Sequence, residues 1–247
     1  MTQMLIGSIL SNIPGFILLI IIIRQARKEI VPRKTLFLLI LAGAVLIVPI
    51  TGLQTVIGLG NTIPFIGEHP LLSEIFMTVL RLAFVEELCK FVATKWITWK
   101  GNYFTNTYQG MLFPAIVGLL FGIVESTAYV ALSLATFPDD IWITVLMRMI
   151  IGAPAHGAYG ILIGKYYGKA KLATHQGNQV LKRKYFWLAL LIPTAIHGAY
   201  DWLVSSQIFK MGDTSIMMII VICLDVLVVI YAYILLYREK NKKQTWG

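Results

Sequence analysis

The sequence predicts an all-α polytopic membrane protein with about seven transmembrane helices in a single domain, residues 1–247. Of its residues 57% are hydrophobic and only 13% are charged, about half the charged share of a soluble domain. Apolar stretches of roughly 20 residues, the length that crosses a bilayer as a helix, recur along the whole chain. The predicted spans are 4–23, 35–57, 74–99, 109–136, 142–167, 185–206 and 215–237.

The first two spans contain no ionisable residue, whereas the next four spans carry several. Span 4–23 lacks the basic start and the cleavage site of a signal peptide, so we interpret it as a membrane helix. The last span contains one acid, Asp225, for which we expect a structural hydrogen bond. The middle spans contain Arg81, Glu86, Glu87, Lys90, Glu125, Arg148, His156, His197 and Asp201, and we expect the two arginines to be counter-charges.

The basic residues predict the orientation of the chain. Most of the 21 Lys and Arg residues flank the same ends of the spans, after 4–23, 74–99, 142–167 and 215–237. Cytoplasmic loops carry this excess, so the N-terminus is expected outside and the C-terminus in the cytoplasm. The net charge of +9 therefore comes from basic residues that flank the membrane spans, and we expect no nucleic-acid partner.

Three charges stand close together in the middle of span 74–99. Each such charge costs on the order of 2.5–3.5 kcal/mol to insert, so the fold or the function must offset it. Glu86 and Lys90 are four residues apart and share a helix face, where they can neutralise each other. Glu87 points about 100° away, and we expect it to lack a partner in its own helix.

Four spans place ionisable groups at a similar depth. At about 1.5 Å per residue, Glu86, Glu125, His156 and His197 lie roughly 14–21 Å from the outer ends of their spans. Helices that share such a polar layer are expected to face one another around a hydrated cavity. Asp201 follows His197 by one turn and could orient its imidazole.

Small residues predict where helices approach closely. Glycines recur every fourth residue at 118 and 122 and at 160, 164 and 168, a spacing that lets backbones touch. Gly152, Pro154 and Gly157 surround His156, so span 142–167 is expected to kink there.

Carboxylates and imidazoles in a wet cavity favour water activation. A carboxylate can act as general base, while a histidine stabilises the oxyanion of a tetrahedral intermediate. Glu and His are also zinc ligands, but the sequence has no His-Glu-x-x-His motif. It also has no Gly-x-Ser-x-Gly elbow, so a serine nucleophile of that type is not indicated.

Four motifs lie on four separate spans: Glu86-Glu87-Leu88-Cys89-Lys90, Phe121-Gly122-Ile123-Val124-Glu125, His156, and His197-Gly198-Ala199-Tyr200-Asp201. In these motifs the sequence resembles the PrsW family of intramembrane proteases, within the wider group of CAAX-processing and bacteriocin-processing membrane proteases. The resemblance covers residues 73–202.

The resemblance implies a protease of the bacterial inner membrane that cuts a single-span membrane protein near its extracytoplasmic side. Such a substrate is plausibly an anti-sigma factor, whose cleavage starts regulated intramembrane proteolysis. Glu86 is then the expected general base and Glu87 an essential neighbour, with Lys90 in a supporting role. Glu125, His156 and His197 would line the site, and Asp201 would support it. We favour a glutamic-type enzyme without a cofactor, with Zn²⁺ as the alternative.

Two other functions are compatible with the polar residues. A proton- or ion-coupled transporter also uses intramembrane Glu, His and Asp, although acids clustered in one half of the chain argue against the inverted repeats of many transporters. An inactive scaffold that binds another membrane segment is the third possibility. Loss of cleavage in a Glu86→Gln variant would distinguish the protease from both.

Overall fold

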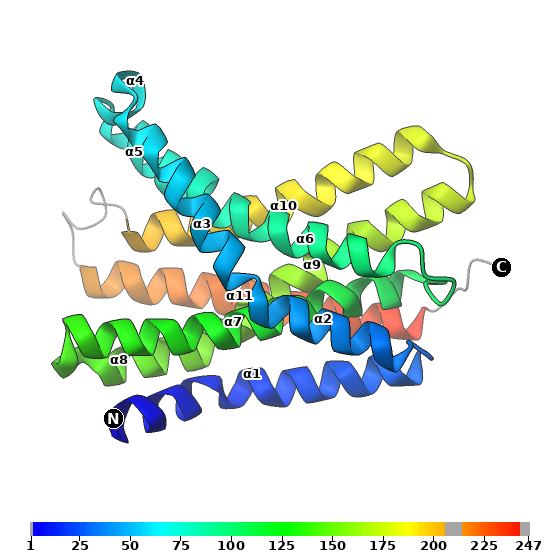
Figure 1. Cartoon of the computed structure of the whole chain (residues 1–247), viewed down its shortest axis with the longest axis horizontal. Coiled ribbons are helices and arrows are strands. Elements are labelled where there is room, and N and C mark those ends of the chain that lie inside the picture. Colours follow the sequence, from blue (N-terminus) through cyan, green and yellow to red (C-terminus); the bar gives the residue numbers. More distant parts are fainter. Residues whose placement is uncertain (1, 206–213, 243–247) are drawn as a thin grey trace.

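The computed structural model describes residues 2–205 and 214–242, and in these ranges it contains helices and no strand (Figure 1). The first elements are α1 (Thr2–Lys28), α2 (Arg33–Val45), α3 (Ile47–Gly58), η1 (Leu59–Thr62), α4 (Pro64–Gly67) and α5 (Pro70–Ile75). The middle elements are the π-helical η2 (Phe76–Phe84), α6 (Val85–Thr98), α7 (Thr107–Thr136), η3 (Pro138–Asp140) and α8 (Ile141–Met147). The last are the π-helical η4 (Arg148–Gly152), α9 (Ala153–His175), α10 (Gln179–Ser205) and α11 (Thr214–Asn241).

All seven predicted spans are helical where the structure describes them. In the described part of the chain, four helical segments are long and apolar enough to cross a membrane: Thr2–Lys28, Thr107–Thr136, Pro138–His175 and Met218–Asn241. The pair α2 and α3, bent by 40°, makes a fifth if it is one span. The count of seven and the orientation stay predictions, and residues 206–213, between the last two predicted spans, lie outside the described residues.

The predicted spans leave two long intervals between them, 58–73 and 168–184, and the expectation that these are loops is wrong. The first is a series of short helical turns, η1, α4 and α5. In the second, α9 continues to His175 and α10 begins at Gln179, so the two form the hairpin that projects at the upper right of Figure 1. The basic residues of this stretch are good helix formers, so the helices continue past their apolar parts. Gly177, at φ +70°, makes the turn, and the Asn178 side chain accepts from the Leu181 amide at 2.9 Å to begin α10.

The helical segments that precede Glu86 and His156 each contain a π-helical stretch. Residues 76–84 are π-helical and end just before Glu86, and residues 148–152 are π-helical and end just before α9. Pro154 has no backbone N–H to donate, and Gly152 departs from helical geometry with ψ −101°. Helical geometry is therefore interrupted at Gly152, near the kink predicted beside His156, and π-helical turns of this kind are frequent at functional sites.

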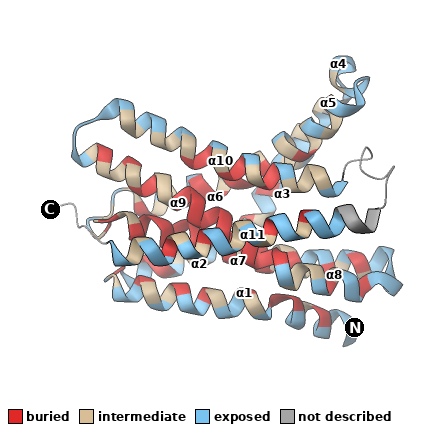
Figure 2. Cartoon of the chain, turned by 180° about the vertical axis from the view of Figure 1, so that it is seen from behind, coloured by how far each residue is buried: buried red, intermediate tan, exposed pale blue. Residues whose placement is uncertain are grey.

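The core lies where α7 packs against α9, and the buried residues concentrate there (Figure 2). Glycines make this approach possible, as their spacing predicted. A Cβ on Gly164 would lie 2.3 Å from Met111 Cα, and one on Gly160 would lie 2.3 Å from the Pro114 carbonyl oxygen. On the other helix, a Cβ on Gly118 would lie 2.2 Å from the His156 carbonyl oxygen. The two backbones are thus in direct contact along their length.

We predict that Gly164→Ala destabilises the protein by about 1–3 kcal/mol, because the added methyl group overpacks a backbone contact. Gly52→Ala is the matched control, since Gly52 is also helical but has nothing within 4 Å of its Cβ position. Thermal unfolding in detergent measures both variants. Equal melting temperatures for the two would contradict close α7–α9 packing.

Candidate active site

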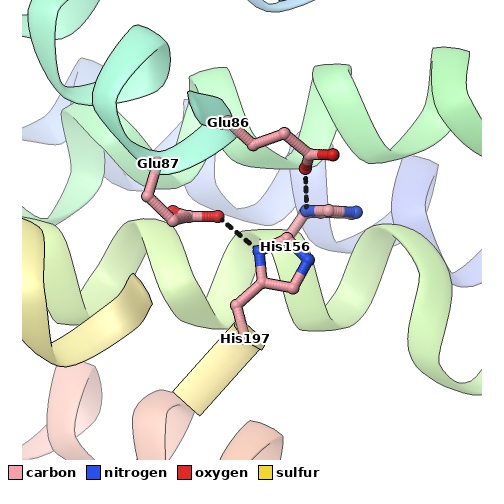
Figure 3. Close-up of side chains that lie close together, drawn as sticks. All are labelled: Glu86, Glu87, His156 and His197. Atoms are coloured by element: carbon pink, nitrogen blue, oxygen red, sulfur yellow. Dashed lines mark hydrogen bonds and ion pairs between the residues drawn. The ribbon is translucent and has the colours of Figure 1, made fainter. Parts of the chain in front are cut away.

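Ionisable side chains from four helices meet at the centre of the molecule, as predicted. Helix α6 supplies Glu86 and Glu87, α7 supplies Glu125, α9 supplies His156, and α10 supplies His197. Glu86 faces His156 with Oε2 4.0 Å from Nδ1, and Glu87 faces His197 with Oε1 2.9 Å from Nδ1 (Figure 3). Residues that lie far apart in the sequence thus form one buried polar cluster.

Lys90 neutralises both acids of its own helix. Its ammonium Nζ lies 3.3 Å from Glu86 Oε2 and 2.9 Å from Glu87 Oε1. The expectation that Glu87 lacks a partner in its own helix is therefore wrong, because a residue three positions away is also within reach. Nζ also lies 2.9 Å from His156 Nδ1, so one cation joins α6 to α9. Neither Lys90 nor Glu87 has exposed side-chain surface.

The tautomer of His156 follows from its two neighbours. The Lys90 ammonium can only donate, so His156 Nδ1 accepts and Nε2 carries the hydrogen. Nε2 then donates to Glu125 Oε2 over 2.8 Å. The ring is held at both nitrogens, with Nδ1 turned toward Glu86.

His197 lies between two carboxylates. Its Nδ1 donates to Glu87 Oε1 at 2.9 Å, and its Nε2 is 3.4 Å from Asp201 Oδ2. This geometry suits an imidazolium, which donates from both nitrogens. Asp201 lies where the sequence predicted it, one turn along α10. The ring of Tyr159 stacks on His197 with centroids 4.8 Å apart.

The two intramembrane arginines differ in their partners. Arg148 forms an ion pair with Glu125 and also donates to Ser126 Oγ at 3.1 Å, so its expected role as a counter-charge is confirmed. Arg81 donates to the backbone carbonyl of Gln54 at 2.8 Å. Among the described residues Arg81 has no carboxylate within ion-pair distance, so the counter-charge expectation is wrong for it.

A cavity of about 220 Å³ adjoins the cluster. Its polar walls come from Gln54, Glu86, Glu125, Tyr129, Arg148, His156, Tyr159, His197, Tyr200, Asp201 and Asp225. Side-chain exposure rises from 7% at Glu86 to 12% at Glu125, 18% at Arg148 and 21% at Asp201. The cavity is therefore most accessible near Arg148 and Asp201, and its volume and polarity suit several water molecules.

Four polar residues of this cavity were not predicted from the sequence. Gln54 donates to Glu86 Oε1 at 3.3 Å, Tyr159 stacks on His197, and Tyr129 and Tyr200 line the wall. The repeated His-Gly-Ala-Tyr at 156–159 and 197–200 is the sequence signal that contains Tyr159 and Tyr200. For Asp225 the expected hydrogen bond is confirmed, since Tyr159 Oη donates to its Oδ1 at 2.7 Å. A hydrogen bond between membrane helices contributes about 0.6 kcal/mol, whereas an acid in a span costs roughly 2.5–3.5 kcal/mol. The hydrogen bond to Tyr159 therefore does not by itself offset the cost of burying Asp225.

The same cluster has donors that suit a divalent metal. One ligand atom each from Glu86, Glu87, His156 and His197 lies within 4.8 Å of the others. Carboxylates and imidazoles are zinc ligands, and the bond from His156 Nε2 to Glu125 is the outer contact that ligating histidines usually make. The donor set therefore fits zinc. Because Lys90 Nζ contacts three of these four groups, binding through all four requires Lys90 to withdraw.

We predict that Lys90→Met lowers the free energy of unfolding by about 3–5 kcal/mol, because it removes the cation that the buried carboxylates of Glu86 and Glu87 share. Lys100→Met is the control, since Lys100 is exposed at the end of α6. Chemical unfolding in detergent measures both variants. A Lys90→Met protein as stable as the Lys100→Met control would show that the ammonium does not stabilise the cluster.

Sequence comparison places this site among known proteins. The family described as "PrsW family intramembrane metalloprotease" matches residues 31–234, which include every residue of the cluster. A protein named "Protease PrsW" from Geobacillus kaustophilus is 27% identical over 194 residues, covering 78% of this chain and 77% of that protein. Proteins of the same name from Clostridioides difficile and Bacillus subtilis are 29% identical over 104 residues and 24% identical over 164 residues. They cover 42% and 66% of this chain, and 41% and 66% of their own lengths.

No solved structure matches the chain. The family match extends over more than half of the sequence and includes all the predicted motifs, from Glu86 to Asp201. The chain therefore belongs to the PrsW family of intramembrane proteases.

Proposed function

We propose that this protein hydrolyses a peptide bond of a membrane-anchored protein near the extracytoplasmic side of the membrane, with water activated by Glu86. The observation that carries this proposal is the cavity whose wall contains Glu86, His156 and His197 together. A general base, groups that position water and a polar site for an oxyanion are the parts that amide hydrolysis requires. The comparisons offer no support for the transporter alternative.

Glu86 is the proposed general base because it is the acid of the Glu86–Glu87 pair that faces the cavity. Glu87 is fully buried between Lys90 and His197, whereas Glu86 lines the cavity wall. Its Oε2 lies 4.0 Å from His156 Nδ1, so a water molecule bound to Glu86 on the cavity side would also lie beside the His156 ring. Glu86 takes a proton from this water as the oxygen attacks the peptide carbonyl carbon.

The carbonyl electrons move to oxygen during this attack, and a positive group must stabilise the resulting oxyanion. His197, held between Glu87 and Asp201, and Arg148, on the cavity wall, are the positive groups that face this space. Collapse of the intermediate breaks the C–N bond, and Glu86 returns its proton to the leaving nitrogen. Zinc held by Glu86, Glu87, His156 and His197 would, when bound, polarise the carbonyl and acidify the water.

The accessible end of the cavity supports cleavage near the extracytoplasmic side. Arg148 precedes His156 by eight residues, about 12 Å, toward the end of its span that is predicted to be outside. Asp201 follows His197 in the same direction along α10, and both are among the more exposed polar groups of the wall. We propose a bacterial inner-membrane location and a single-span substrate of the anti-sigma-factor kind.

We predict that Glu86→Gln and His156→Ala each reduce cleavage of a single-span substrate about 100-fold or more, the range expected for loss of a general base or of its partner. Purified protein in detergent or liposomes, with substrate fragments resolved by gel and mass spectrometry, gives the rates. Glu68→Gln is the matched control, because Glu68 is an exposed acid outside the site. Full activity of either variant would remove that residue from the mechanism.

A chelator distinguishes the glutamic-type mechanism from the zinc mechanism. We expect cleavage to persist in chelator, because Lys90, His197 and Arg148 already supply positive charge around the reacting groups. Metal content measured on the same sample serves as the control that the chelator has worked. Loss of activity that is restored by added zinc would overturn the glutamic-type mechanism and leave the protease assignment intact.

A further inference from the structure

Helix α11 packs against the protein along one narrow stripe. In its described part the buried side chains are Val221, Asp225, Ala232 and Leu236, whose spacing places them on one side of the helix. Asp225 is the one ionisable member of this stripe in that part, and only 4% of it is exposed. Its Oδ2 is buried and has no hydrogen-bond partner among the described residues, so Oδ1 makes the contact that holds the side chain.

That contact leads directly to the candidate active site. Asp225 Oδ1 accepts from Tyr159 Oη over 2.7 Å. The Tyr159 ring stacks on His197, with centroids 4.8 Å apart and planes 20° apart, and meets the His156 ring edge-on at 6.0 Å. Asp225, Tyr159 and both histidines line the same cavity. The hydrogen bond therefore fixes the aromatic plane on which the His197 imidazole lies.

We propose that Asp225 and Tyr159 are positioning residues that hold the His197 imidazole in place for the reaction. This inference rests on the proposed function, because it assigns the role of the pair through His197. Glu87 and Asp201 hold the two nitrogens of His197 but leave the ring free to tilt about the line between them. Stacking on Tyr159 restrains that tilt, and Asp225 restrains Tyr159. The last helix thereby becomes part of the catalytic apparatus without touching substrate.

A buried tyrosine on α9, the helix that carries Tyr159, provides the matched control. Tyr167, two turns further along α9, shares a hydrogen bond of 2.8 Å with Thr98 Oγ1 and is fully buried. Tyr167→Phe thus removes a comparable helix-to-helix hydrogen bond that does not reach either histidine of the site. Any effect that appears in Tyr159→Phe and not in Tyr167→Phe therefore comes from the place of Tyr159 in the site and not from the loss of a buried hydrogen bond in general.

Activity measurements on three variants test the role of the hydrogen bond between Tyr159 and Asp225. Tyr159→Phe keeps the ring and loses the donor, Asp225→Ala loses the acceptor, and Asp225→Asn keeps an oxygen that can accept. We expect about a tenfold fall in kcat for Tyr159→Phe and Asp225→Ala, with KM changed less than twofold, since displacement of a reacting group affects the chemical step. Asp225→Asn should recover most of the activity lost in Asp225→Ala.

Histidine NMR provides a readout that needs no cleavage. The chain has four histidines, so a sample labelled with ¹⁵N-histidine gives few side-chain signals, and the loss of one in His197→Gln assigns His197. We expect the His197 signals to shift and broaden in Tyr159→Phe and Asp225→Ala and to stay unchanged in Tyr167→Phe. If the wild type cleaves no candidate substrate, the proposed function fails while this measurement still tests the positioning.

Unchanged kcat and unchanged His197 signals in Tyr159→Phe would overturn the proposal. An Asp225→Asn variant as impaired as Asp225→Ala would overturn it as well, since the hydrogen bond would then not be the basis of the effect. If Asp225→Ala does not fold, kcat and the His197 signals of Tyr159→Phe decide the question, because this variant removes one oxygen atom and keeps the buried ring. Thermal unfolding of Tyr159→Phe and Tyr167→Phe shows whether the two variants are equally stable.

Discussion

The contact between the Lys90 ammonium and the Glu86–Glu87 pair is the interaction on which the polar centre depends. Two adjacent carboxylates repel each other, and each is costly to bury in an apolar helix. One cation within 3.3 Å of both removes most of that repulsion and also reaches His156 Nδ1 at 2.9 Å. Because a single ammonium satisfies groups from α6 and α9, the charge balance of the cluster and the relative placement of these helices are coupled.

Backbone packing supports the same centre from the other side. The α7 glycines at 118 and 122 contact the His156 carbonyl oxygen and Ala153, so the close approach of α7 and α9 brings Glu125 within 2.8 Å of His156. The π-helical turns before α6 and α9 redirect each chain immediately ahead of its site residues. The backbone hydrogen bonds thus depart from the α-helical pattern just before the positions where the side chains of the site converge.

Most of the helices and the members of the candidate site were predictable, whereas the pairing of charges was not. Glu125 and Arg148 form an ion pair as expected, but Arg81 donates to a backbone carbonyl and Glu87 shares Lys90 with Glu86. The loop expected at 168–184 is mostly helix, because the lysines that mark a membrane boundary also favour helical structure. Tyr159 was missed because the repeated His-Gly-Ala-Tyr marks it as a neighbour of His156, whereas its stacking contact is with His197 on another helix.

The amino-acid sequence is enough to predict that this chain is helical, that it is a membrane protein and that ionisable groups occupy the interiors of separate apolar segments. These properties depend on local composition and on the 3.6-residue period, which also places Lys90 one turn from Glu86. Tertiary structure alone decided that Glu86 faces the cavity and Glu87 does not, and that Asp225 reaches His197 through Tyr159. Such contacts depend on how each helix is rotated and tilted against its neighbours, and packing between distant segments sets those angles.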